Sequence, residues 1–326
     1  MTASGSKALC FLLLLAMATP GVGMAATPSI SDSFSAFWQS AQGQPFAEQE
    51  RLWDGDIEAP CRDLYASIVW ETQHRPDWQT QKQRTLQARF AEYPKLAAGI
   101  PTEVRALQAA IALQSIRLRQ LFPDANTYPP VEILLAPNFD AKSGVLSSGA
   151  PVLVFAADSL LLEQANLSIV VPHELFHLYH AQHAGISNDG VMPGVDLTVP
   201  LFEEGLATYV SGQLSPGHTD GELLLQDDLG SLAIDKFPDI ARRFLADAHH
   251  QAIDPVHPEI FKRWFSANAK PYQHDLPNRS GYWLGLQLVR YLRRTYPLAQ
   301  IAAWSRSQVQ THAIATLQQI SAPVAK

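Results

Sequence analysis

The hydrophobic and polar positions of the first part of the chain recur with the period of helices. Residues 62–75 and 77–93 predict two helices that are separated by a proline. The clearest helix of this part begins at Pro101, because proline is tolerated in a first helical turn, and it ends at Pro123. We therefore expect residues 26–125 to form a helical N-terminal part.

The pattern changes beyond residue 125. Residues 131–135 form a short apolar run bounded by prolines, and residues 152–155 form a second one after a turn-rich segment, so both predict strands. Segments with helical spacing follow, the best of them at 199–214 and 282–296. We therefore expect residues 126–326 to combine a small sheet with several helices, which makes the whole chain α+β and mostly helical.

The first 25 residues have the features of a targeting segment. Lys7 is followed by an apolar stretch at 8–18 that is too short to span a membrane, and small residues precede Ala26. The pattern predicts a signal peptide over residues 1–25 and an exported protein, periplasmic or secreted; an uncleaved anchor is the alternative. No later segment is long and apolar enough to span a bilayer, so we expect no stable membrane insertion after cleavage.

Composition and charge narrow the possible functions. The chain is 47% hydrophobic and 17% charged, which is enough apolar material for a large core. Its formal net charge of −7 and the lack of any basic run argue against nucleic acid as a partner, since phosphates require Lys and Arg. Cleavage before Ala26 would leave Cys61 as the only cysteine and exclude an intrachain disulfide.

The candidate chemistry begins with His173-Glu174-Leu175-Phe176-His177. Two histidines four residues apart on a helix face the same way, so both imidazoles can bind one Zn²⁺ at about 2.0–2.1 Å. Glu174 projects toward the open side of such a metal, where it can take a proton from the attacking water. The alternative is a helix with histidines that serve only the core, but the apolar residues around the motif favour a metal that satisfies both imidazoles together.

A catalytic zinc site usually has a third protein ligand, and two residues compete for that role. Glu204 lies on the next predicted helix, with Thr208 one turn later, where its hydroxyl can support the carboxylate. His183 has the spacing of a third histidine, but His180 stands where that pattern needs a glycine to bend the chain. The spacing therefore favours Glu204 over His183.

These residues resemble a known clan. The first motif, followed by Glu203-Glu204-Gly205-Leu206-Ala207-Thr208-Tyr209, is similar to the gluzincin clan of zinc metallopeptidases, especially to bacterial exported predicted Zn-dependent proteases and more distantly to the aminopeptidase N family. The match covers residues 173–209 and little of the N-terminal part. It implies a zincin-like domain over 126–326, in which a small sheet packs on the metal-binding helix and helical parts flank it.

The resemblance also implies roles for single residues. His173, His177 and Glu204 would be metal ligands, and Glu174 would be the general base. The Gly-Ala-Met-Glu-Asn exopeptidase motif of the aminopeptidases does not occur in this sequence, so the resemblance does not extend to aminopeptidase activity.

Such enzymes also stabilise the oxyanion of the reaction with a downstream tyrosine or histidine. Tyr282, in a Tyr-x-x-Gly helix start, is the candidate here, with a core role as the alternative. His218 and His274 are weaker candidates in loops flanked by Pro or Gly. Residues 152–155 can offer a sheet edge to an extended peptide, or they can form an ordinary buried strand.

The function expected from these features is the hydrolysis of peptide bonds in a peptide or protein substrate, with Zn²⁺ as the cofactor. The main alternative is an exported binding or assembly factor that keeps the fold without catalysis. A third possibility is a protein without a metal. The sequence does not indicate the oligomeric state.

Overall fold

The computed structural model describes residues 29–125, 129–184, 195–254 and 256–322. The expected signal peptide at residues 1–25 lies outside these ranges. The N-terminal part is helical, as the sequence predicts. Its elements are α1 (Ile30–Ala41), α2 (Phe46–Trp53), η1 (Asp54–Glu58), η2 (Ala59–Cys61), α3 (Arg62–Leu64), η3 (Tyr65–Val69), α4 (Trp78–Leu96) and α5 (Ile100–Leu121).

The sheet has three strands in the order β1-β3-β2. Strands β1 (Val131–Leu134) and β3 (Pro151–Ala156) are parallel, and β2 (Ala141–Val145) is antiparallel to β3. The prediction that residues 152–155 can offer a sheet edge is therefore wrong, because β3 is paired on both sides and its residues from Val152 onward are buried. Among the described residues β2 pairs only with β3, so it is an edge strand, and the sequence pattern did not indicate it.

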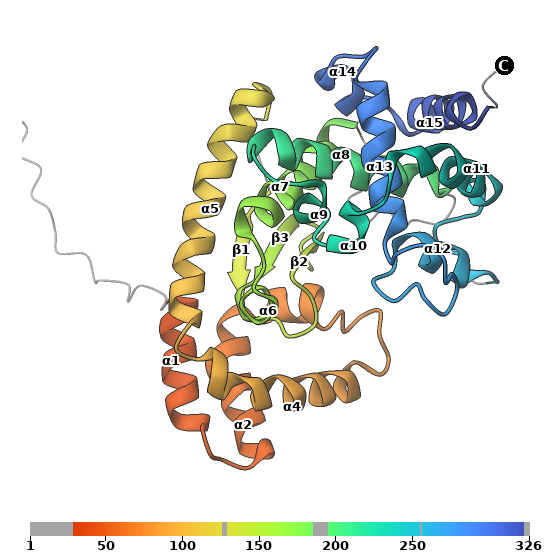
Figure 1. Ribbon diagram of the computed structural model, residues 1–326. Helices are drawn as coiled ribbons and strands as arrows, with labels where there is room; N and C mark the ends of the chain where they lie inside the picture. The colour runs from red at the N-terminus through yellow and green to blue at the C-terminus, as the bar shows by residue number, and fades with distance from the viewer. Residues whose placement is uncertain (1–28, 126–128, 185–194, 255, 323–326) are drawn as a thin grey trace, which may run out of the picture.

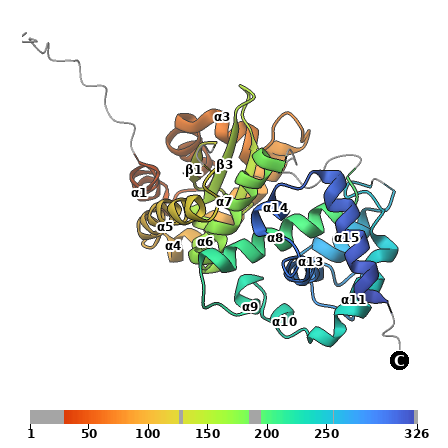
Figure 2. The ribbon, with the colours of Figure 1, turned by 90° about the horizontal axis from the view of Figure 1, so that it is seen from above.

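Helices make up the rest of the chain, so the fold is α+β and mostly helical, as expected. Figures 1 and 2 show the N-terminal helices on one side of the sheet and the last helices on the other. Within the described residues, no helix has both the length and the apolar composition needed to cross a membrane. The helices are α6 (Ala157–Glu163), α7 (Leu167–Ala184), α8 (Thr198–Leu214), α9 (Asp220–Leu223), α10 (Asp227–Gly230), η4 (Ile234–Lys236), α11 (Phe237–Asp247), α12 (Pro258–Phe265), α13 (Ser280–Leu292), α14 (Leu298–Ala302) and α15 (Arg306–Ser321).

A buried polar cluster joins the N-terminal helices to the sheet. Asp158, at the start of α6, is completely buried and accepts hydrogen bonds from the Tyr93 hydroxyl at 3.1 Å and from the Ala136 backbone N–H at 2.8 Å. Arg89 of α4 donates to the backbone carbonyl of Asp158 at 2.9 Å and to the hydroxyl of Ser159. Because buried charges are tolerated only when they are paired, this cluster fixes α4 against the sheet. The helical part and the part that follows residue 125 thus share one core.

Helix α7 is buried over most of its length between the N-terminal part and α8. It packs on α5 and on α8, and the Ser211 hydroxyl of α8 donates to the Ile169 carbonyl at 2.9 Å. The helix begins at Leu167, little more than one turn before Pro172, so this proline lies near the helix start, where it is best tolerated.

Helix α8 packs even more closely on α13. The two helices cross at Gly205 and Gly285, where an added Cβ on either glycine would lie 2.2 Å from the other helix's backbone. This close crossing requires two residues without side chains. The crossing brings Glu204 of α8 and Tyr282 of α13 to the wall of one cavity.

Candidate metal centre

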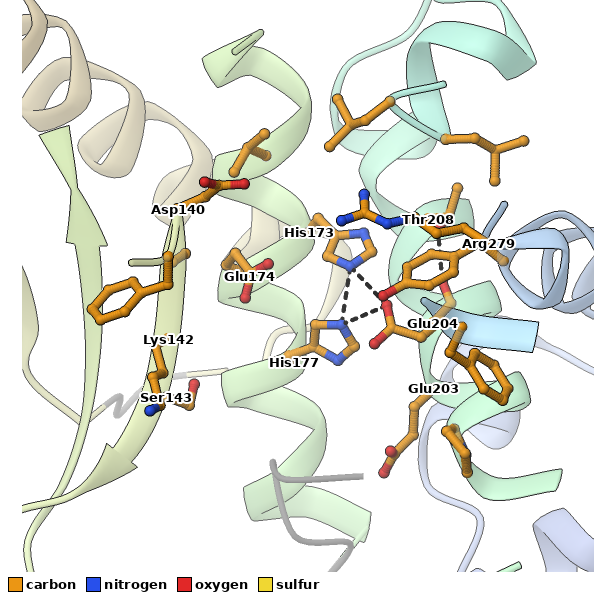
Figure 3. A pocket seen from close by; sticks show the side chains of 18 of the residues that line it. Asp140, Lys142, Ser143, His173, Glu174, His177, Glu203, Glu204, Thr208 and Arg279 are labelled. Atoms are coloured by element: carbon orange, nitrogen blue, oxygen red, sulfur yellow. Dashed lines mark hydrogen bonds and ion pairs between the residues drawn. The ribbon is translucent and has the colours of Figure 1, made fainter. Parts of the chain in front are cut away.

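Three side chains from α7 and α8 converge on one point (Figure 3). The Nε2 atoms of His173 and His177 are 3.0 Å apart, as expected for residues one turn apart on a helix. The Oε2 atom of Glu204 lies 3.2 Å from Nε2 of His173 and 3.4 Å from Nε2 of His177. The sequence motif and the glutamate of the next helix therefore form a single cluster.

The spacing of these atoms fits a tetrahedral metal ion. Ligand atoms about 2.0–2.1 Å from a tetrahedral Zn²⁺ lie about 3.3–3.4 Å from one another. The three observed separations of 3.0, 3.2 and 3.4 Å are close to this value. Two imidazoles and one carboxylate are a donor set that catalytic zinc sites use, and the fourth position is left for a reactant. The cluster can therefore hold a divalent metal ion such as Zn²⁺.

The electrostatics of the cluster also suit a cation. Burial lowers the pKa of the His177 imidazole, but the carboxylate of Glu204 outweighs burial and raises that pKa to about 9. Burial raises the pKa of Glu204, but the imidazoles of His177 and His173 lower it by more than burial raises it. The pKa of Glu204 therefore lies well below its usual range. The pocket thus stabilises positive charge next to Glu204, which a bound metal ion supplies as well as a proton does.

The cluster opens into a cavity of about 600 Å³. Glu174 also lines this cavity, and Figure 3 shows its carboxylate on the side of α7 that faces β2. The opposite wall contains Asp140, Lys142 and Ser143, at and just before the edge strand. A molecule in the cavity therefore lies between the metal-binding helix and β2, with Glu174 beside it.

Tyr282, the expected oxyanion residue, lies in the first turn of α13 and lines the same cavity. The negative charge of the Glu204 carboxylate acts on its phenol. Burial raises the pKa of Tyr282 well above its usual value, and Glu204 raises it further. The phenol therefore keeps its proton at neutral pH and can donate a hydrogen bond next to the metal position.

The competing histidines lie elsewhere. His183 is on the same straight helix as the motif but forms an ion pair with Asp124, with Nε2 and Oδ2 2.9 Å apart, so it turns away from the cluster. His218 contacts the Ser168 hydroxyl at 3.0 Å, and His274 is exposed; neither lines the cavity.

The predicted support of the Glu204 carboxylate by Thr208 is wrong. The Thr208 hydroxyl donates to the backbone carbonyl of Glu204 at 2.8 Å. A threonine inside a helix commonly bonds to the carbonyl four residues earlier, and this local bond competes with one to a side chain. Thr208 still lines the cavity, but the carboxylate is held by the two histidines and faces Tyr282.

Several residues of the cavity carry no signal that the sequence patterns detected. Asp140, Lys142 and Ser143 belong to a stretch without regular alternation, so neither their strand nor their position was expected. Arg279 is different, because it directly precedes the segment that led to Tyr282. An arginine at the start of a helix that carries a candidate catalytic residue was a signal that could have been used.

Comparisons with known proteins add no relative to this geometry. No family model, no curated protein sequence and no solved structure matches the chain. The function must therefore be inferred from the cluster and the cavity themselves.

Proposed function

We propose that this chain is an exported zinc-dependent peptidase with a zincin-like fold. The observation that carries the proposal is the convergence of His173, His177 and Glu204 at the spacing of tetrahedral ligands, with the Glu174 carboxylate beside them in an open cavity. Histidines that serve only a core have no reason to share a carboxylate at the wall of a cavity. The alternative, a binding factor without catalysis, gives no role to Glu174.

The residues of the chain divide the reaction among them. When bound, Zn²⁺ would polarise the scissile carbonyl and make the attacking water more acidic. Glu174 accepts the proton of that water and returns it to the leaving amine. Tyr282 keeps its proton and donates a hydrogen bond to the oxygen on which negative charge develops.

Strand β2 supports a peptide as the substrate. Among the described residues β2 pairs only with β3, so its second edge has free backbone donors and acceptors. An extended peptide can add to such an edge through main-chain hydrogen bonds. Because residues of β2 and Glu174 line the same cavity, a peptide bound there would place one of its bonds near the metal.

The test begins with protein purified from an exporting host without added metal. We expect about one equivalent of zinc by elemental analysis and cleavage of unstructured peptides that a chelator abolishes. Glu174→Gln should retain the zinc and lower kcat by about 10²–10⁴-fold, because it removes only the proton carrier. Glu132→Gln, which makes the same change away from the cavity, serves as the control. Equal turnover by Glu174→Gln and the wild type would disprove the catalytic proposal.

Export is tested separately from chemistry. We expect the mature protein in the periplasm or the medium to begin at Ala26, and the mass of the intact protein measures this directly. A mature protein that retained residues 1–25 would favour the uncleaved anchor instead.

A further inference from the structure

A charged residue to which no role has been assigned, Arg279, enters the cavity from the side of α13. It precedes the helix in a left-handed conformation with φ of 54°, an unusual position for a residue with a long side chain. Its backbone N–H donates to the Ser266 carbonyl at 3.2 Å, and its carbonyl accepts from the N–H of Tyr282 at 2.9 Å. These bonds hold the backbone at the cavity wall, and the side chain enters the cavity (Figure 3).

The guanidinium of Arg279 has no anionic partner among the described residues. It forms no salt bridge or side-chain hydrogen bond there, and its Nε atom is buried without an acceptor. Arg290 and Arg89 differ, because Asp220 holds the first through two bonds of 2.6 Å and Asp158 contacts the second. A guanidinium remains charged at any physiological pH, and the described residues offer no acceptor to the donors of Arg279, so these donors are free to bind an anion in the cavity.

Glu163, whose carboxylate feels the charge of Arg279, does not form a salt bridge with it. Burial and the negative charge of Asp140 raise the pKa of Glu163. Arg279 attracts Glu163 only from beyond salt-bridge distance. The planar guanidinium carbon instead lies 5.7 Å from the ring centre of Tyr282, a cation–π contact that orients the group and leaves its edge free.

We propose that Arg279 binds a carboxylate of the substrate and makes this peptidase selective for anionic peptides. The inference rests on the proposed function, because it assigns the substrate class of that same site. Arginine binds a carboxylate through two parallel N–H···O bonds, which fixes the orientation of the ligand as well as its position. The cation–π contact between Arg279 and Tyr282 therefore places the bound anion near the oxyanion residue.

Two sources can supply the carboxylate: the C-terminus of a peptide, or an aspartate or glutamate side chain. Both present the same planar acceptor to Arg279. The first makes the protein a peptidase that cuts near the C-terminus, and the second makes it an endopeptidase with acidic preference. The experiment distinguishes them by peptide chemistry.

The test measures binding without turnover, on zinc-loaded Glu174→Gln protein. The probes are three fluorescein-labelled sets of mixed-sequence peptides: free acids without Asp or Glu, the same peptides as C-terminal amides, and amides that contain Glu. Fluorescence anisotropy should show about 10- to 100-fold tighter binding of one carboxylate-bearing set over the neutral amides. Tighter binding of the free acids identifies the C-terminus, and tighter binding of the Glu-containing amides identifies a side chain.

Variants of Arg279 then show whether this residue causes the preference for peptides that carry a carboxylate. In the Glu174→Gln protein, Arg279→Gln should remove the preference. Arg279→Lys should retain only part of it, because lysine keeps the charge but cannot form the two parallel hydrogen bonds of a guanidinium. Arg294→Gln, which removes an exposed charge beyond the far end of α13, should leave the preference intact. Circular dichroism and zinc content show whether each variant is folded.

The outcomes separate this inference from the proposed function. Equal affinity for all three peptide sets, or a preference that survives Arg279→Gln, overturns the role of Arg279. If the wild type also cleaves neutral and anionic peptides alike, the peptidase proposal stands and the selectivity does not. Absence of binding to any peptide would overturn both.

Discussion

The crossing of α8 and α13 offers a direct test of how the fold positions the site. In Gly285→Ala the new Cβ would lie 2.2 Å from the backbone oxygen of Leu201. Carbon–oxygen contacts normally begin at about 3.3 Å, so the helices must separate by about 1 Å. The three atoms nearest to the new Cβ all belong to the backbone of α8, so no flexible side chain can move to relieve the contact.

The expected cost follows from two opposing effects. Overpacking a tight interface costs about 1–3 kcal/mol, and a rigid backbone contact belongs at the upper end. Alanine recovers about 0.8–1.0 kcal/mol over glycine inside a helix. The net destabilisation of about 2 kcal/mol should lower Tm by about 4–8 °C, measured by differential scanning fluorimetry. Gly55→Ala, where an added Cβ meets nothing within 4 Å, is the matched control and should leave Tm nearly unchanged.

The same variant should affect activity more than metal binding. His173 and His177 lie on α7, so a shift of α13 away from α8 moves Tyr282 relative to the cluster and leaves the ligands together. A displacement of about 1 Å at a catalytic group can lower turnover by about 10²-fold. We therefore expect zinc content to be retained while kcat falls. A Gly285→Ala protein with the Tm and kcat of the wild type would refute the idea that this crossing sets the geometry.

Three further variants test other parts of the site and fold. Tyr282→Phe should lower kcat by about 10²–10³-fold with zinc content unchanged, and steady-state kinetics on a cleaved peptide would show it; unchanged kcat would exclude the oxyanion role. His177→Ala should lose zinc in elemental analysis while His183→Ala retains it, and the reverse would reassign the third ligand. Hydrogen bonds from Arg290 lower the pKa of Asp220 in the folded protein. The pair therefore stabilises the fold fully above pH 3.8, the ordinary pKa of that group, and this stabilisation is lost as the pH falls through the lower pKa of the folded state. Asp220→Asn should thus lower the free energy of unfolding at pH 7 by less than about 1 kcal/mol, because the pair is part-exposed, and should lower Tm accordingly. In acid its Tm should match that of the wild type, and an equal Tm difference at both pH values would contradict this.

The elements that the sequence predicts well are those that the core requires. α5 begins one residue before the expected proline and ends two residues before the expected stop, because one of its faces is buried. β3 was expected from a continuous apolar run, which is typical of a strand buried on both faces. Burial of one face requires apolar residues about once per turn in a helix and at every second position in a strand, and such a period can be recognised in a single sequence.

The candidate cluster was accessible for a different reason. His173 and His177 are adjacent through local helix geometry, so their spacing alone predicts that they meet. Glu204 lies on another helix, and it was expected to join them because His180 in place of a glycine argued against His183 and because a known motif has a glutamate there. Its position depends on how α7 packs on α8, which local patterns do not encode.

What the sequence concealed is concentrated at the cavity. β2 has the sequence Ala-Lys-Ser-Gly-Val, with little apolar character, and it is held as a strand by its pairing with β3. Arg279 likewise has no periodic position, since it lies in a left-handed turn before α13. Residues that face a ligand are selected for contacts with that ligand, so burial does not impose a period on them. The features that sequence patterns miss are therefore the ones that an open site needs: a strand edge and a charged group that have no partner in the part of the chain that the structure describes. Both lie opposite or beside Glu174 in this protein, which is why the peptide and its carboxylate are assigned to the same cavity.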